Sequence, residues 1–125
     1  MDRRRELKRE YMETEKLIGA FKIVNKVNNK IFVGTGINLE AVFNSYRFQM
    51  TYGVLLQNRE LSEDWKKYGE ENFSFEIVDL IKQNPDPKYN YKKDLEVLEE
   101  LWLEELQPYE EKGYNKKPVE RSILT

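Results

Sequence analysis

The strongest constraint on the fold is the spacing of the apolar residues. Along the chain this spacing alternates between patterns typical of strands and patterns typical of helices. Residues 20–24 and 31–33 are short runs of β-forming residues, and Asn28-Asn29 between them tolerates the positive φ of a tight turn. These runs predict two antiparallel strands. We expect Gly34-Thr35-Gly36 to end the second strand.

A helical spacing follows the hairpin. Leu39, Val42, Phe43 and Tyr46 lie at positions i, i+3, i+4 and i+7, and Asn38 precedes them as a suitable N-cap. This spacing predicts an amphipathic helix.

Two shorter elements come next. Residues 58–67 predict a helix that ends at Gly69. Residues 73–78 alternate with a period of two, which predicts a strand with three large apolar side chains on one face. These side chains are Phe73, Phe75 and Ile77.

The last expected element is a long helix over residues 94–106, after a proline-containing loop at 83–90. At about 100° per residue, Glu99 lies roughly 40° from the centre of the apolar stripe of this helix. A carboxylate turned toward a core needs a hydrogen bond, a cation or a metal. The alternative is a glutamate at the helix flank that reaches solvent. The stripe consists of Leu95, Leu98, Trp102 and Leu106.

Length and composition narrow the classes of protein. The 125 residues suit one domain, and we expect a helix over 1–18, a main domain over 19–117 and a tail over 118–125. The first segment either packs on the domain or links it to a partner. No run approaches the roughly 18 apolar residues of a membrane helix, so we expect a soluble, cytoplasmic protein with no membrane partner.

The chain has neither cysteine nor histidine, which excludes disulfides, thiolate metal sites and the commonest general base. Lys and Arg number 21 against 23 acids, a net charge of -2, which argues against tight nonspecific binding of nucleic acid. This balance does not exclude a local basic patch near the N-terminus, although solvated charge on a helix surface is the simpler interpretation. The patch comprises Arg3, Arg4, Arg5, Lys8 and Arg9.

Several segments in one order resemble the GIY-YIG endonuclease family. They are Gly19-Ala20-Phe21, Phe32-Val33-Gly34, residues 61–73, Glu99 with Trp102-Leu103, and Gly113-Tyr114-Asn115. The resemblance covers residues 19–115. It implies an α+β fold with a small three-stranded antiparallel sheet flanked by helices, and cleavage of DNA phosphodiester bonds with one divalent metal.

The resemblance also shows which functional groups have been replaced. The two tyrosines of the family triplets correspond to Phe21 and Phe32, which keep the ring but lack the hydroxyl. The arginine on the first helix of the family corresponds to Val42, which offers phosphate neither charge nor a hydrogen bond. We therefore expect the structural roles to survive without the chemical ones.

Three family positions keep polar side chains. Tyr46 stands where the family has a histidine or tyrosine that helps to activate water, although a core aromatic at this position is the simpler interpretation. Glu99 matches the metal-binding glutamate. Asn115 matches the asparagine of the closing motif, where it either positions a phosphate or ties a loop to the sheet.

Two functional hypotheses remain. The first is a pseudoenzyme: a non-catalytic module that binds nucleic acid or a protein and needs no cofactor. The second is a divergent DNA endonuclease that uses Mg²⁺ or Mn²⁺ at Glu99, with Tyr46 as base and Lys22 or Lys30 in place of the arginine. The replacement of Phe21, Phe32 and Val42 favours the first.

Overall fold

The computed structural model describes residues 16–55 and 57–117. None of the helices in these two ranges is long and apolar enough to cross a membrane. The elements in chain order are β1 (Ile18–Asn25), β2 (Ile31–Gly36), α2 (Leu39–Thr51), α3 (Arg59–Tyr68), a 3-10 turn (Glu70–Asn72), β3 (Phe73–Ile81), α4 (Lys92–Leu106) and a second 3-10 turn (Glu110–Lys112).

The three strands form one antiparallel sheet in the order β2-β1-β3. The predicted α+β class and three-stranded sheet are therefore confirmed, including the hairpin turn at Asn29, whose φ is 65°. The expected N-terminal helix falls mostly on residues 1–15, outside the described residues. Its assumed last residue, Ile18, instead begins β1 and is paired with Ile81.

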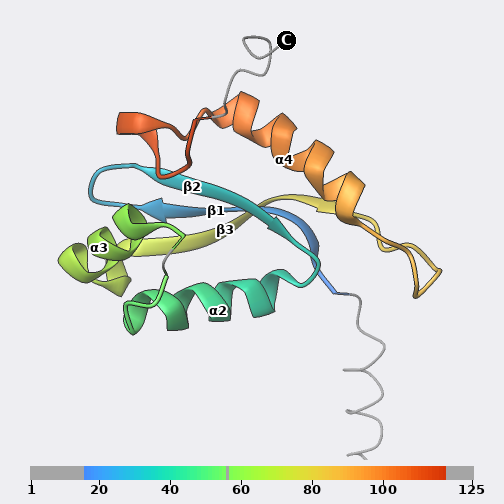
Figure 1. Cartoon of the computed structure of the whole chain (residues 1–125), viewed down its shortest axis with the longest axis horizontal. Coiled ribbons are helices and arrows are strands. Elements are labelled where there is room, and N and C mark those ends of the chain that lie inside the picture. The colour runs from blue at the N-terminus through green and yellow to red at the C-terminus, as the bar shows by residue number, and fades with distance from the viewer. Residues whose placement is uncertain (1–15, 56, 118–125) are drawn as a thin grey trace, which may run out of the picture.

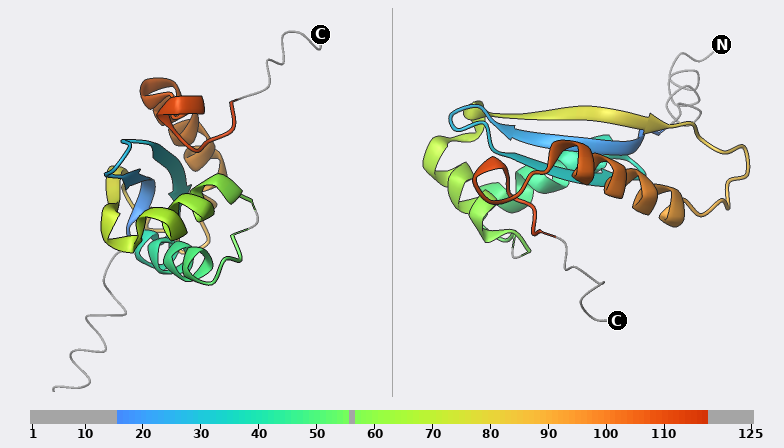
Figure 2. Two further views of the ribbon diagram at one scale, coloured as in Figure 1. Left: turned by 90° about the vertical axis from the view of Figure 1, so that its left-hand side faces the viewer. Right: turned by 90° about the horizontal axis from the view of Figure 1, so that it is seen from above.

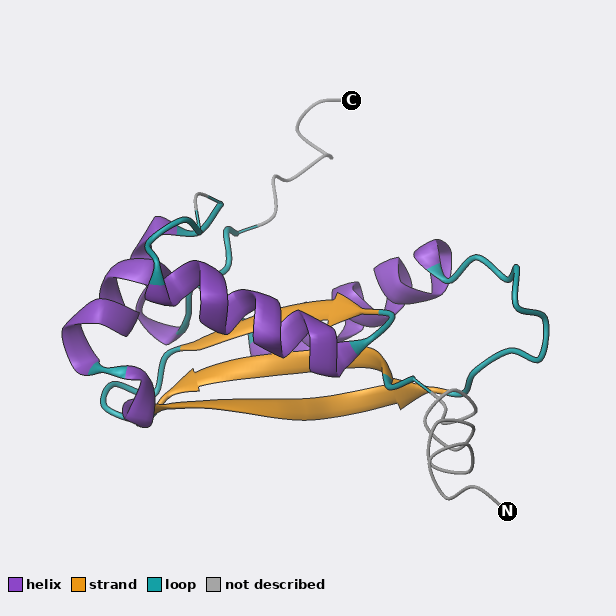
Figure 3. Cartoon of the chain, turned by 90° about the horizontal axis from the view of Figure 1, so that it is seen from below, coloured by secondary structure: helices purple, strands orange, loops and turns teal. Residues whose placement is uncertain are grey.

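Helices cover the sheet on both sides (Figure 1). The long helix α4 lies on one side and α2 on the other, and the view along the sheet in Figure 2 shows the same three layers. Seen from below, α2 crosses the strands while α3 lies near one of its ends (Figure 3). The buried core lies on the α2 and α3 side; α4 contributes no fully buried residue.

The helix boundaries follow from local capping. The side chain of Asn38 accepts a hydrogen bond from the amide of Ala41 at 3.3 Å, and Asn58 accepts one from the amide of Leu61 at 3.1 Å. Gly69 ends α3 with a φ of 88°, a conformation that favours glycine. The predicted start of α2 and the predicted end of α3 near Gly69 are confirmed.

Strand β2 ends at Gly36, within the expected Gly34-Thr35-Gly36 stretch, but it includes these three residues and so extends beyond 31–33. The two glycines also serve close packing. A Cβ atom added at Gly34 would lie 2.7 Å from Cζ of Phe21, and one added at Gly36 would lie 2.7 Å from Cγ2 of Val42. The missing side chains let the Phe21 and Val42 side chains pack directly on β2.

The expected apolar face of β3 is buried at one end only. Phe73 is buried and Phe75 is half-buried, but Ile77 is 41% exposed. The pairing of β1 with β3 keeps its register through Ile77, which pairs with Phe21, and shifts only beyond it, where Val78 is an extra residue in β3. The period of two therefore holds through Ile77 and ends at this bulge.

Candidate functional site

Phe21 and Phe32, the two positions at which the family resemblance places tyrosines, lie in an aromatic cluster on the α2 side of the sheet. Phe21 is only 1% exposed, and its ring centroid lies 5.4 Å from that of Phe43, 5.8 Å from Tyr46 and 6.3 Å from Phe32. The rings of Phe32 and Tyr46 are 5.6 Å apart. Such tilted and edge-on pairs stabilise a packed core. Phe21 thus fills the core beside β2.

Val42 occupies the arginine position at the start of α2. It is half-buried, packs against the core, and its methyl group lies close to Gly36. The aliphatic side chain of Val42 packs against the end of β2 and presents no positive charge to an anion.

The two lysines considered as substitutes for the arginine have other partners. Lys30 forms an ion pair with Glu60 at 2.8 Å and lies over the ring of Tyr114 at 5.2 Å. Lys22 lies 3.8 Å from a carboxylate oxygen of Glu76. Both ammonium groups are therefore engaged with groups other than Glu99.

Tyr46 lies at the boundary between the core and the Glu99 side. Burial raises the pKa of its hydroxyl above the usual value, and the negative charge of Glu99 raises this pKa further. The pKa of Tyr109 is raised by the same two causes. Both hydroxyls therefore stay protonated near neutral pH, which is unfavourable for a general base.

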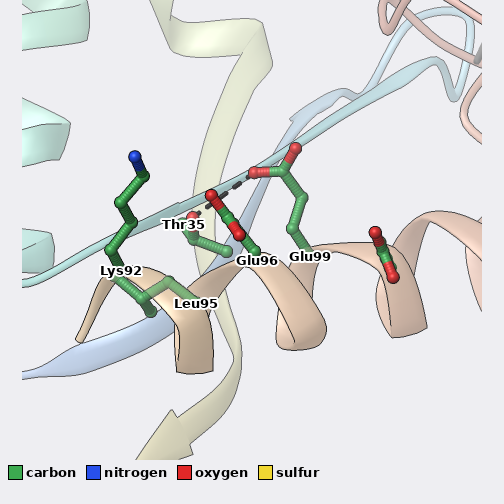
Figure 4. Close-up of a pocket in the computed structure, with 6 residues that line it drawn as sticks. Thr35, Lys92, Leu95, Glu96 and Glu99 are labelled. Atoms are coloured by element: carbon green, nitrogen blue, oxygen red, sulfur yellow. Dashed lines mark hydrogen bonds between the residues drawn. The ribbon is translucent and has the colours of Figure 1, made fainter.

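Glu99 faces an open cavity of about 580 Å³ that is lined by α4 and by Thr35 of β2. Its carboxylate accepts a long hydrogen bond of 3.4 Å from the hydroxyl of Thr35, so the expected partner of this glutamate is a strand residue (Figure 4). Three carboxylates and one ammonium group line the cavity. The lining residues are Thr35, Lys92, Leu95, Glu96, Glu99 and Glu100.

The family resemblance implies a divalent metal at Glu99. The oxygen ligands near Glu99 can be compared with the coordination that such an ion requires. Mg²⁺ prefers an octahedron of oxygen ligands, supplied by carboxylates, phosphates and water. Among residues 16–55 and 57–117, no three His, Cys, Asp or Glu side chains are placed to hold one ion together. Glu99 with the Thr35 hydroxyl does not form a preformed metal site.

Asn115 binds the outer edge of β2. Its Oδ1 accepts a hydrogen bond from the amide of Val33 at 2.8 Å, and its Nδ2 donates one to the carbonyl of Val33 at 2.9 Å. The side chain thus pairs with β2 as a neighbouring strand would. Both hydrogen bonds of the side-chain amide tie the C-terminal loop to the sheet, which is the structural role expected for Asn115 as the alternative to phosphate positioning.

One polar network was missed at the sequence level. The hydroxyl of Tyr114 donates to Asp64 at 2.7 Å and accepts from Nδ2 of fully buried Asn25 at 3.0 Å. Burial, above all, and then the contact with Asp64 raise the pKa of Tyr114, whereas the hydrogen bond with Asn25 lowers it. The available signal was Asn25 itself, a polar residue that continues the inward period of Phe21 and Ile23.

Together, these features define an α+β domain with a three-stranded antiparallel sheet between α2 and α4. No protein-family model and no curated protein sequence matches this chain.

Two solved structures share the architecture. One is a glutamate-to-alanine mutant of the catalytic domain of intron endonuclease I-TevI, 23% identical with a TM-score of 0.66, covering 79% of this chain and 92% of that chain. The other is the catalytic domain of homing endonuclease I-TevI, 24% identical with a TM-score of 0.63, covering 81% and 99%. The chain has a GIY-YIG-like fold.

Proposed function

We propose that this GIY-YIG-fold domain is a non-catalytic binding module and that its partner is a nucleic acid. The observation that supports the loss of catalysis is the burial of Phe21 at 1% exposure, in contact with Gly34 and three other rings. A residue in this environment stabilises the core. Carbon at this position and at Val42 supplies no hydroxyl and no guanidinium for phosphate chemistry.

The charge of the cavity supports the non-catalytic part of this proposal. Glu96, Glu99 and Glu100 oppose a single ammonium group, that of Lys92, along its lining. A phosphodiester entering this space meets an excess of negative charge, whereas phosphate binding depends on Lys and Arg. Tyr46 adds no base, since its raised pKa keeps it protonated.

One observation favours the alternative, a divergent metal-dependent endonuclease. Glu99 lies on an open cavity, and its charge is close enough to raise the pKa of both Tyr46 and Tyr109. A carboxylate with two nearby hydroxyls is a chemically usable set if a metal and the substrate phosphates complete it.

A plasmid-nicking assay with Mg²⁺ or Mn²⁺ separates the two functions. We expect no cleavage by the wild-type chain and none by Glu99→Ala. The matched control is Glu104→Ala, which removes an exposed acid from the same helix. Cleavage that disappears in Glu99→Ala and persists in Glu104→Ala would show that the domain is an enzyme.

The contribution of the N-terminal basic cluster needs its own measurement. If Arg3, Arg4 and Arg5 contact phosphates, the affinity for DNA falls steeply with salt, and their replacement by alanine lowers this salt dependence. Absent or salt-independent binding would indicate a protein partner instead.

A further inference from the structure

Two exposed aromatic rings lie together at the end of α2. Phe48 is 60% exposed and Tyr52 is 68% exposed, and their ring centroids are only 4.7 Å apart. Val54, which follows them, is also exposed. Water thus contacts most of both rings, an unfavourable arrangement for two large apolar groups that a binding partner would relieve.

Two cations of α3 line a cavity at Gly53, the residue that follows Tyr52. The ammonium group of Lys66 lies next to Gly53. A Cβ atom added at Gly53 would be 2.6 Å from this ammonium group. Arg59, Ser62 and Lys66 lie on one face of α3 and line a cavity of about 210 Å³ with Gly53. Within residues 16–55 and 57–117, neither cation forms a salt bridge.

The location of this surface keeps it apart from the acidic helix. Helix α4 carries six acidic residues and two lysines, and it lies on the opposite side of the sheet from α2 (Figures 1 and 2). Helix α2 carries one acid and one base over 13 residues. A polyanion therefore approaches the end of α2 without crossing the carboxylates of α4.

We propose that Phe48, Tyr52, Arg59 and Lys66, here named the α2–α3 surface, bind a single-stranded nucleic acid. Exposed rings stack on bases, while nearby cations contact the phosphates between those bases. This combination distinguishes the surface from a purely apolar patch for a protein. The inference rests on the proposed binding function and places its site away from Glu99.

Glu63 also lines the cavity and opposes an anion there. Two cations against one acid leave a small positive excess, so we expect modest affinity dominated by stacking. The opposing charge provides a sensitive test, because Glu63→Gln removes repulsion without touching either ring and should tighten binding about two-fold.

The stacking step is tested with fluorescence anisotropy on a fluorescein-labelled oligothymidylate of about 12 nucleotides, a length within known single-strand site sizes. Tyr52→Ala and Phe48→Ala should each weaken binding by about 10-fold. Tyr52→Phe should retain binding, whereas Tyr52→Leu should not, since leucine keeps apolar area but has no ring. Tyr89→Ala, which removes an exposed tyrosine paired with half-buried Tyr91, should leave affinity unchanged.

The phosphate step is tested through salt dependence. Each phosphate contact contributes about 0.7 to the log–log slope for a single strand, so Lys66→Ala should reduce the slope by about that amount. Lys88→Ala, at an exposed lysine in a loop, should leave the slope unchanged. Thermal unfolding of every variant verifies that the domain is folded.

Absence of oligothymidylate binding by the wild-type chain would overturn the inference, as would equal losses in Tyr52→Ala and Tyr89→Ala. Oligothymidylate binding by Tyr52→Leu as tight as by wild type would show that apolar area suffices without a ring, which also overturns the inference. These results are independent of the nicking assay. Glu99-dependent cleavage contradicts the non-catalytic function alone, whereas an unaffected Tyr52→Ala contradicts the α2–α3 surface alone.

Discussion

The two faces of the sheet differ in what they retain of a nuclease-like domain. On the α2 side, Phe21, Ile23 and Leu39 are buried in a continuous core that excludes water. On the α4 side, no residue of the helix is fully buried, and Glu99 borders an open cavity. The α2 face of the sheet is covered by closely packed apolar side chains. The α4 face is charged and open, and it carries Glu99, a possible ligand group.

This difference shows that fold and chemistry can be separated along one sheet. The positions at which the resemblance places two tyrosines and an arginine fall on the packed face, where Phe21, Phe32 and Val42 strengthen the core. The glutamate position falls on the open face, where a carboxylate is tolerated by solvent. Carbon side chains on the packed face are therefore compatible with both Glu99 and the architecture.

The largest expected effect is on stability at the packed face. Phe21→Ala should lower the free energy of unfolding by about 3–5 kcal/mol, because it removes a fully buried ring and leaves a cavity. Leu98→Ala, at a half-buried site on α4, should cost distinctly less. Urea unfolding measures both. Equal losses would contradict the distinction between the two faces.

An intermediate effect is expected at the β2 edge. Asn115→Ala removes two hydrogen bonds to Val33 and should lower stability by about 1–3 kcal/mol, at roughly 0.5–1.5 kcal/mol for each bond. Asn44→Ala, at an exposed position of α2, is the control and should change stability little. If Asn115→Ala instead lowers only the affinity for nucleic acid, its role in phosphate positioning is the correct one.

The smallest effect is a pH dependence that reaches across both faces. The pKa values of Tyr46 and Tyr109 are raised in the folded state, so their stabilising contribution is complete below the unfolded pKa of about 10 and is lost as pH rises through the higher folded values. Glu99→Gln should lower both pKa values in a tyrosinate absorbance titration. Glu104→Gln should leave them unchanged; an identical shift would mean that Glu99 does not act locally.

The sequence was sufficient for the elements and their order because local periodicity determines which faces are apolar. It was insufficient where tertiary contacts decide. The bulge in β3, which follows Ile77 and ends the period of two, depends on the pairing of this strand with β1. The packing role of Gly34 was not visible in the sequence, because the ring that packs on it, that of Phe21, comes from another strand.

The candidate site was only partly predictable for a similar reason. Spacing on one helix identified Glu99 as a carboxylate in need of a partner, but Thr35 lies 64 positions away. The contact of Tyr114 with Asn25 spans 89 positions, beyond any periodicity. The exposure of Phe48 and Tyr52 could not be read from the helix pattern, because an aromatic pair one turn apart is compatible with either a core or a surface.

The hydrogen bonds of Asn115 have a consequence for self-association. An amide side chain that satisfies Val33, together with the bridge between Ile31 and Gly113, covers part of the outer border of β2, so that stretch is not free to template another chain. Proteolytic removal of the chain after residue 112 would uncover it. A clipped molecule would then be at risk of stacking strand to strand into fibrils.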